Sequence, residues 1–388
     1  MERPLLNRRM AGLTTTIFAE MSALAVQTGS INLGQGFPDT DGPAQMAAAA
    51  ADAVLAGRGN QYPPGAGVPE LRQAIAAHQK RFYQLAVDPD TEVLVTAGAT
   101  EAIAAAMLAL LEPGDEVIAL EPYYDSYAAC IALAGARRVP VTLRPPSFRP
   151  DLDALRDAVT GRTRLLLLNS PHNPTGMVLT GPELTAIAEL AIERDLLVVT
   201  DEVYEHIVYS GEHIPLATLP GMRERTVTIS SAGKTFSFTG WKVGWVTGTP
   251  ELVAAVRAVK QFLTFVASGP FQYAVAAGLG LDDAFYAGLA DGLRHRRDLL
   301  ADGLAAAGFE VFSPDGTYFI TTDISPLGHS DGVQFCRDLP RLCGVVAIPN
   351  GVFYNDTGGG GSQVRFAFCK QEAVLVEAAS RLRQLSGP

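Results

Sequence analysis

The sequence predicts an α/β fold in which a large αβα domain, built on a mostly parallel sheet, is joined to a smaller α/β domain. From about residue 92, short β-rich runs alternate with longer alanine-rich helical runs, the pattern of strands joined by helices. The strand-like runs are apolar along their whole length, as in strands with two buried faces. After about residue 275 this alternation gives way to one long helical segment and shorter strands.

Each expected element follows from its own stretch of sequence. Strands are expected at 92–98, 117–122, 137–143, 164–171, 196–202 and 226–231. Helices are expected at 100–116, which is closed by Pro-Gly, and at 181–194. In the second part, residues 282–308 have an amphipathic helical pattern, and "FEVF", "GTYFITTDI" and "QVRFAFC" are typical of strands.

The composition is that of a soluble globular enzyme. Hydrophobic residues make up 48% and charged residues 18% of the 388 residues, and the formal net charge is −11. Nucleic acids and anionic membranes require a basic surface, so neither is expected as a partner. No run of about 18 apolar residues predicts a transmembrane helix, and the N-terminus lacks a signal-peptide pattern. Four cysteines without paired short spacing favour reduced thiols in the cytoplasm.

Polar residues gather where the predicted parallel strands end. Ligands of doubly wound sheets bind beyond the carboxyl ends of the strands, so these positions are the first candidates for a site. The positions are Gly98 to Thr100, Glu121 to Tyr124, Asn169 to Asn173, Asp201, and Ser231 to Lys234. An acid, an asparagine, a tyrosine, serines and a lysine are therefore expected at one edge of the sheet.

Lys234 is the candidate nucleophile of this group. It lies in "SSAGKTFSFTGWKVGW" (230–245), which holds two of the few lysines in a chain that otherwise uses arginine. Burial disfavours the charged form of a lysine, and the free amine can attack a carbonyl such as the aldehyde of pyridoxal 5'-phosphate (PLP). The alternative is a solvated loop lysine.

Other candidates have a structural alternative as well. Asp201 could hold a pyridine nitrogen in its protonated form or cap the next helix. Tyr204 could reach a ring hydroxyl and Tyr124 could stack on a flat ring, but aromatic residues are also common in protein cores. The turn "TAGATEAI" (96–103) opens a helix that suits phosphate, or it is a tight packing turn. Arg365 could clamp a carboxylate or lie on the surface.

Two further kinds of site are not supported by the sequence. Gly65 and Gly67 do not complete a dinucleotide-binding fingerprint, because Glu70 stands where another small residue is needed and no suitable strand precedes them. The six histidines show no ligand spacing, so no metal is expected.

Three motifs resemble those of class I aminotransferases of PLP fold type I. They are "NSPHNPTG" (169–176), "DEVYEHIVY" (201–209) and "SSAGKTFSFTGWKVGW" (230–245). "NLGQGFPD" (32–39) and "NQYPPGAGVPELR" (60–72) are similar to the branch that holds kynurenine, glutamine and methionine aminotransferases. The resemblance covers essentially the whole chain and keeps the motifs in order.

The resemblance implies which residues are catalytic. Lys234 would bind PLP covalently and move a proton between the substrate Cα and the cofactor. Asp201 would pair with the ring nitrogen, and Tyr204 and Asn173 would contact the ring hydroxyl. Tyr124 would take the position of the ring-stacking aromatic residue.

It also implies how phosphate and substrate are held. The phosphate cradle would consist of Ala99, Thr100, Ser231 and Lys242. Tyr62 would reach the phosphate from the neighbouring subunit, which implies a homodimer with shared active sites. Arg365, Asn173 and the backbone at Gly36 would bind the substrate carboxylate.

The family further implies an arrangement of domains. Residues 31–275 would form the large PLP-binding domain, and residues 1–30 and 276–388 the small domain. A helix in "TTTIFAEMSALA" (14–25) would line the substrate entrance. The Ser170–Pro171 and Asn173–Pro174 bonds are candidates for cis peptides.

The expected reaction is a ping-pong transfer of an amino group between an L-amino acid and a 2-oxo acid. "TTTIFAEMSALA", "NQYPPG" and "VTAGATEAIAAA" resemble actinobacterial N-succinyldiaminopimelate aminotransferases, so N-succinyldiaminopimelate with 2-oxoglutarate and glutamate is the specific expectation. A kynurenine, glutamine or methionine type enzyme stays open, as does a cysteine-conjugate β-lyase. A ligand-sensing regulator is disfavoured, because such proteins add an N-terminal DNA-binding domain and this sequence starts at the aminotransferase part.

Overall fold

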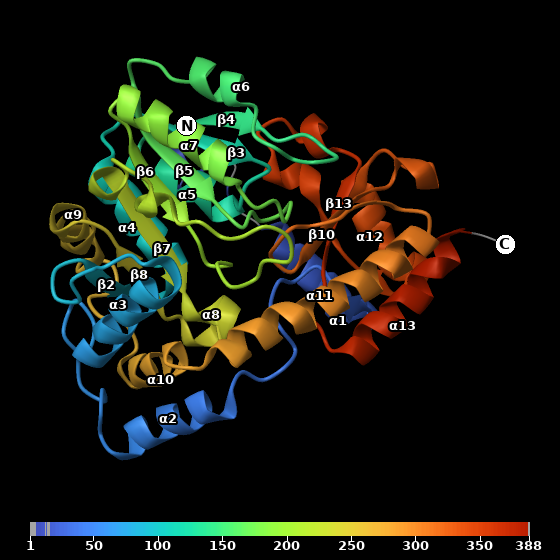
Figure 1. The fold of residues 1–388 in the computed structure, drawn as a ribbon. Helices are drawn as coiled ribbons and strands as arrows, with labels where there is room; N and C mark the ends of the chain where they lie inside the picture. Colours follow the sequence, from blue (N-terminus) through green and yellow to red (C-terminus); the bar gives the residue numbers. More distant parts are fainter. Residues whose placement is uncertain (1–4, 12, 14–15, 387–388) are drawn as a thin grey trace.

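A seven-stranded sheet forms the centre of the larger part of the molecule (Figure 1). The structure is a computed structural model that describes residues 5–11, 13 and 16–386. The strands are β2 (Val93–Thr96), β3 (Glu116–Glu121), β4 (Arg137–Thr142), β5 (Thr163–Asn169), β6 (Leu197–Asp201), β7 (Thr226–Ser231) and β8 (Gly244–Thr247). Their order is β2-β8-β7-β6-β5-β3-β4, with β3 to β7 parallel and β8 antiparallel to both of its neighbours.

Helices pack on both faces of this sheet. They are α2 (Ala44–Leu55), α3 (Pro69–Tyr83), α4 (Gly98–Leu110), α5 (Asp125–Ala134), α6 (Leu152–Asp157), α7 (Gly181–Glu193), α8 (Ala232–Thr235), α9 (Pro250–Lys260) and α10 (Gly269–Leu279). Val117 and Ala119 of β3 share a core with α4, α5 and α9, whereas Ile118 and Leu120 share a core with α7. Because successive side chains point to opposite faces, a strand covered on both sides has to be apolar throughout.

The smaller part is built on a four-stranded antiparallel sheet of order β12-β13-β10-β9. Its strands are β9 (Glu310–Phe312), β10 (Phe319–Asp323), β12 (Ile348–Pro349) and β13 (Gln363–Ala367), and β1 (Ile31–Asn32) pairs separately with β11 (Val345–Val346). Four helices share its core, namely α1 (Ile17–Thr28), α11 (Asp283–Ala306), α12 (Gly332–Cys343) and α13 (Glu372–Leu382). The long helix α11 runs from the larger part into the smaller one (Figure 1).

Helix boundaries follow local sequence signals. Helix α7 begins with a capping box, in which the Thr180 hydroxyl accepts from the Glu183 N–H and the Glu183 carboxylate accepts from the Thr180 N–H. Helix α1 begins after Thr16, whose hydroxyl accepts from the Ala19 N–H, and ends at Gly29 in the left-handed region. The N-terminal helix predicted within 14–25 therefore exists, although Thr14 and Thr15 lie outside the described residues.

The predicted α/β class with a mostly parallel sheet is confirmed. All six strands predicted for the larger sheet occur within a few residues of their expected bounds. The seventh strand of this sheet, β8, was not predicted. It runs antiparallel between β2 and β7. Ser170–Pro171 and Asn173–Pro174 are both cis.

The domain boundaries and the absence of a membrane-spanning helix were also predicted. The boundaries of the two domains, 31–275 against 1–30 with 276–388, stay a prediction. Within the described residues, no helix combines the length and the apolar character that a membrane span requires.

Gly244 allows β8 to approach the start of α4 closely. A Cβ atom at this position would lie 2.6 Å from the Gly98 carbonyl carbon and 2.8 Å from the Ala99 nitrogen. We expect Gly244→Ala to lower the free energy of unfolding by about 1–3 kcal/mol, because rigid backbone would have to move. Gly161→Ala is the control, since a Cβ there meets no atom within 4 Å. Equal stability of the two variants in urea unfolding would contradict this close approach.

Candidate active site

A cavity of about 280 Å³ lies at the carboxyl ends of β5, β6 and β7. Every candidate site residue except Tyr62 lines it: Gly36, Ala99, Thr100, Tyr124, Asn173, Asp201, Tyr204, Ser231, Lys234, Lys242 and Arg365. These residues come from both parts of the molecule and are up to 329 positions apart in the sequence (365 − 36). The structure therefore brings together a set that the sequence predicted one strand end and one motif at a time.

Asp201 occupies the end of the central strand β6 and is buried. Its Oδ2 accepts a hydrogen bond of 2.6 Å from the Tyr127 hydroxyl, and its Oδ1 accepts one of 3.4 Å from the Val203 N–H. Burial raises the pKa of this carboxyl to about 6, although both hydrogen bonds and the charge of Lys234 oppose the shift. The free-energy cost of keeping this carboxylate charged would fall if a cation lay in the cavity.

Lys234 is partly buried at the end of the short helix α8. Its Nζ lies 5.8 Å from the centres of the Tyr204 and Tyr318 rings. Burial lowers the pKa of the amine, and the nearby cations Lys242 and Arg365 act in the same direction. The solvated loop lysine, left open by the sequence, is not what the structure contains.

Arg365 extends from β13 of the smaller sheet into the cavity and is buried. Its Nη1 donates to the Asn173 Oδ1 at 2.9 Å and its Nη2 donates to the Gly34 carbonyl at 3.1 Å. The Nε atom has no hydrogen-bond partner, and the guanidinium carbon lies 4.0 Å from the centre of the Phe319 ring. Burial lowers the pKa of this guanidinium to about 10. An anion in the cavity would offer the partner that Nε lacks.

Gly36 lies beside this arginine at the mouth of the cavity. Its carbonyl accepts a hydrogen bond of 2.6 Å from the Tyr318 hydroxyl. A Cβ atom at Gly36 would lie 2.4 Å from the Phe319 ring, so the contact admits only glycine without movement of that ring.

The start of α4 and Lys242 together form a cradle for an anion. Gly98 begins the helix at φ +78°, and a Cβ there would lie 3.2 Å from the Lys242 Nζ. The ammonium group is thus held beside the free N–H groups of Ala99 and Thr100, the end of a helix that attracts anions. Ser231 lines the same cavity from the end of β7.

Two tyrosines complete the walls of the cavity. Burial raises the pKa of Tyr124 to about 12, and burial also raises the pKa of Tyr204. Both phenols therefore stay protonated and can donate hydrogen bonds at neutral pH. The ring of Tyr124 packs edge-on against Tyr127 at a centroid distance of 5.7 Å.

Several residues of the cavity had no role assigned to them from the sequence, although Asn169 was among the strand-end positions. Tyr127 and Asn169 contact Asp201, the latter through a bond of 2.8 Å from its amide to the Asp201 carbonyl. The remaining ones include Phe18, Gln35 and Phe319. A signal existed for Tyr127, because it follows Tyr124 by three residues on a helix and so shares its face. Phe18 lies in the helix that was expected to line the entrance.

Tyr62 is the predicted site residue that the structure places outside the cavity. Its side chain is 81% exposed and contacts the Phe265 ring edge-on at 5.3 Å. Phe265 and Phe262 are also exposed, by 54% and 85%. Tyr62 therefore does not contribute to the cavity of its own chain.

The residues of the cavity fit PLP. The amine of Lys234, whose pKa is lowered, suits the aldehyde of PLP. The buried carboxylate of Asp201 has no cationic hydrogen-bond partner and suits the pyridine nitrogen. The start of α4 beside Lys242 suits the phosphate. Arg365 lines the same space, and its guanidinium group, whose Nε has no hydrogen-bond partner, suits a substrate carboxylate. Such a set can bind an amino acid by its carboxylate and move a proton at its Cα.

The fold and this set of residues define the chain as a class I aminotransferase of fold type I. The chain belongs to the family "Aminotransferase class I and II", whose model matches residues 28–382. Enzymes of this family depend on PLP.

The chain is 55% identical over 389 aligned residues to the "Probable N-succinyldiaminopimelate aminotransferase DapC" of Mycobacterium tuberculosis, covering 97% of this chain and 98% of that one. It is 43% identical to the methionine aminotransferase of Escherichia coli K12, covering 97% of each. The solved structure of the M. tuberculosis N-succinyldiaminopimelate aminotransferase superimposes with a TM-score of 0.96 over 98% of this chain and all of that one. An aspartate aminotransferase of Thermus thermophilus, 34% identical, gives a TM-score of 0.91 over 99% of this chain and all of that one.

The raised pKa of Asp201 predicts a pH-dependent stability of the cofactor-free protein. A carboxyl whose pKa rises from 3.8 to about 6 on folding destabilises the folded state once it ionises, so stability falls as pH rises through this window. Asp201→Asn removes that cost. We expect its gain in free energy of unfolding over the unchanged protein to be larger at pH 8 than at pH 5 by about 1 kcal/mol.

Denaturant unfolding of the cofactor-free proteins at both pH values measures this difference. Asp302→Asn is the control, because Asp302 is exposed on the surface of α11. A gain for Asp201→Asn that is the same at pH 5 and pH 8 would show that burial does not raise the pKa of this group.

Proposed function

We propose that this enzyme is a PLP-dependent aminotransferase that moves the amino group of N-succinyldiaminopimelate to 2-oxoglutarate, forming glutamate. The choice of this substrate is supported by the 55% identity to a relative named a probable N-succinyldiaminopimelate aminotransferase, over nearly the full length of both chains. The cavity supports the same reaction, because it holds a cation for the α-carboxylate and an amine that can shuttle protons. The four buried free cysteines are in keeping with a reducing cytoplasm.

PLP would be held by groups at both ends and along its ring. The N–H groups of Ala99 and Thr100, with Ser231 and Lys242, would bind the phosphate. Bound PLP supplies an electron-withdrawing ring that makes the substrate's Cα proton acidic. Asp201 would keep the ring nitrogen protonated, which is what a carboxylate in a buried site favours.

Other side chains would orient the ring and the substrate. Tyr204 and Asn173 would contact the ring hydroxyl, and Tyr124 would stack on the ring. Arg365 would grip the substrate α-carboxylate with the help of Asn173 and the backbone at Gly36, since planar guanidinium groups bind carboxylates through two parallel bonds.

Lys234 would be the group that attaches the cofactor and moves the proton. Burial lowers the pKa of its amine, so a larger fraction is uncharged and able to attack a carbonyl. Its free amine would be the base that takes and moves the proton at the substrate Cα.

We also propose a homodimer in which Tyr62 of each subunit reaches the phosphate of the other active site. This is supported by the position of Tyr62 outside its own cavity, in contact with the exposed ring of Phe265. Exposed apolar groups that lie together favour a protein–protein contact.

A methionine- or kynurenine-type enzyme is the second candidate. Among the described residues that line the cavity, the cationic side chains are Lys234, Lys242 and Arg365, and each already has a role in the shared chemistry. No further cation of this set remains for a distal carboxylate, which favours an uncharged substrate side chain. The relative of 43% identity is named a methionine aminotransferase, and one of 35% identity is a mouse kynurenine–oxoglutarate transaminase.

A screen of amino donors separates these candidates. N-succinyldiaminopimelate, kynurenine, methionine and glutamine are each supplied with 2-oxoglutarate, and the formation of glutamate is measured. We expect kcat/KM to be at least about tenfold higher for N-succinyldiaminopimelate, a difference of about 1.4 kcal/mol in transition-state binding. The highest kcat/KM for methionine or kynurenine would favour the second candidate instead. Release of pyruvate from cysteine conjugates, followed in the same screen, reports β-lyase activity.

Replacement of Lys234 tests the role of its amine. We expect Lys234→Ala to abolish the visible absorbance of the lysine-bound cofactor and to lower kcat by about 10²-fold or more, because the general base is lost. Lys80→Ala, at an exposed position of α3, is the control. Normal turnover by Lys234→Ala would disprove the mechanism.

A further inference from the structure

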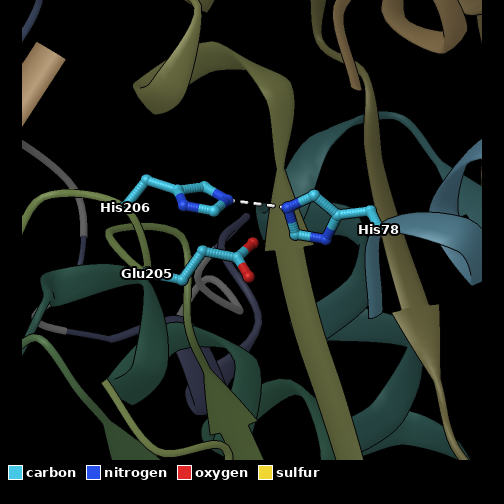
Figure 2. Close-up of side chains that lie close together, drawn as sticks. All are labelled: His78, Glu205 and His206. Carbon is cyan, nitrogen blue, oxygen red and sulfur yellow. Dashed lines mark hydrogen bonds between the residues drawn. The ribbon is translucent and has the colours of Figure 1, made fainter. Parts of the chain in front are cut away.

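A buried polar cluster lies behind the active site. Figure 2 shows its three side chains, His78 from α3 and Glu205 and His206 from the turn after β6, pointing toward one another. The two histidine Nε2 atoms are 2.6 Å apart, a hydrogen bond in which one ring donates to the other. His78 is 2% and Glu205 5% exposed. None of the three lines the cavity, so the reaction described above does not use them directly.

Glu205 joins three segments of the chain through one carboxylate. Its Oε1 accepts a hydrogen bond of 2.6 Å from the Ser230 hydroxyl of β7. Its Oε2 accepts one of 2.7 Å from the Tyr83 hydroxyl at the end of α3. Its two hydrogen-bond donors are hydroxyl groups and not cations, which is a costly environment for a buried charge unless the geometry is fixed.

The groups around this carboxylate oppose the effect of its burial on its pKa. Burial raises the pKa of Glu205, but the charges of His78, His206 and His213 and the bond from Ser230 outweigh burial, so the pKa is lowered overall. Burial lowers the pKa of His206 to about 3 and also lowers the pKa of His78. The hydroxyl groups of Ser230 and Tyr83 are the groups that hydrogen-bond this carboxylate directly.

The neighbours of this network in the sequence are active-site residues. Tyr204 precedes Glu205 and Ser231 follows Ser230, and both Tyr204 and Ser231 line the cavity. Successive residues of a strand point to opposite sides, so Ser230 faces the rear when Ser231 faces the cavity. The Glu205–Ser230 bond thus ties two walls of the cavity together from behind.

A metal site is the other function that two histidines and a carboxylate suggest. Two nitrogens bound to one tetrahedral zinc ion lie about 3.3 Å apart, because each Zn–N bond is about 2.0–2.1 Å. The 2.6 Å between the Nε2 atoms is a hydrogen-bond distance, and both carboxylate oxygens of Glu205 already accept from hydroxyl groups. Metal binding would have to break these three bonds, so the geometry favours a structural network.

We propose that Glu205 is a positioning residue of the aminotransferase, which holds Tyr204 and Ser231 at their places in the cavity through its bonds to Ser230 and Tyr83. The His78–His206 pair fixes α3 against the turn that carries Glu205. This proposal rests on the proposed roles of Tyr204 and Ser231 toward PLP. A positioning role predicts that the network acts on cofactor binding and on kcat, and leaves the binding of the amino donor unchanged.

The test compares Glu205→Gln and Ser230→Ala with the unchanged holoenzyme. The measurements are the Kd of PLP by absorbance titration, kcat and KM for the amino donor, and the Tm. We expect both variants to raise the Kd of PLP about tenfold and to lower kcat about tenfold, with KM for the amino donor unchanged within twofold. Glu205→Gln replaces one acceptor oxygen by an amide group, and Ser230→Ala removes the donor of the Glu205–Ser230 bond. Because both act on one network, the loss in the double variant should be smaller than the sum of the two single losses.

Thr228→Val is the matched control for Ser230→Ala. Thr228 lies two residues earlier on the same strand, is buried, and its hydroxyl has no hydrogen-bond partner. It should leave the Kd of PLP and kcat unchanged. Ser230→Ala removes a single oxygen atom, so it carries the test if Glu205→Gln does not fold.

Two results would overturn the proposal. One is a loss of Tm in both variants while the Kd of PLP and kcat stay within twofold, which would show a role in stability alone. The other is stoichiometric binding of Zn²⁺ to the purified enzyme that His78→Asn abolishes, which would make the cluster a metal site. The Kd of PLP is measured without an amino donor, so a failure of the proposed substrate leaves this test intact.

Discussion

The burial of the Asp201 carboxylate is the constraint on which the active site depends. Asp201 ends β6, and its backbone is fixed by β5 on one side and β7 on the other. Its side chain meets a tyrosine hydroxyl and a backbone N–H, neither of which is a cation. A fold that holds a carboxylate in this way loses stability unless a cation enters the cavity, and the protonated ring of the PLP that we propose would offset this cost.

The same parallel sheet supports the site from two directions. In front, Tyr127 of α5 donates to Asp201, and Asn169 at the end of β5 donates to its carbonyl. Behind, Glu205 accepts from β7 and α3. Because β-strand side chains alternate, each strand end can supply one residue to the cavity and the next to a supporting network. The side chains of the cavity are thus positioned by the edge of the sheet, and not by any one loop.

The sequence predicted those parts of the structure that leave a local pattern. Strands buried on both faces were recognised as apolar runs in the sequence, and the candidate site positions were recognised as polar residues at the ends of these runs. Strand β8 was missed because four residues beginning with glycine leave too short a pattern. Tyr127 and Glu205 were missed because their partners lie 74 positions away for Tyr127 and 25 or 122 positions away for Glu205. Hydrogen bonds between residues so far apart in the sequence depend on how the elements pack, and the hydrophobic periodicity of one segment does not predict them.

The substrate that we propose carries more charge than the cations lining the cavity can pair with. N-succinyldiaminopimelate carries carboxylates beyond the one at its reacting carbon, and a buried carboxylate requires a cation or several donors. The cations lining the cavity are Lys234, Lys242 and Arg365, which we assign to the aldehyde, the phosphate and the α-carboxylate. A subunit that accepts this substrate must therefore meet its distal carboxylates with groups outside that lining. In the homodimer that we propose, groups of the second subunit would have to supply them, which would make dimer formation part of specificity as well as of cofactor binding.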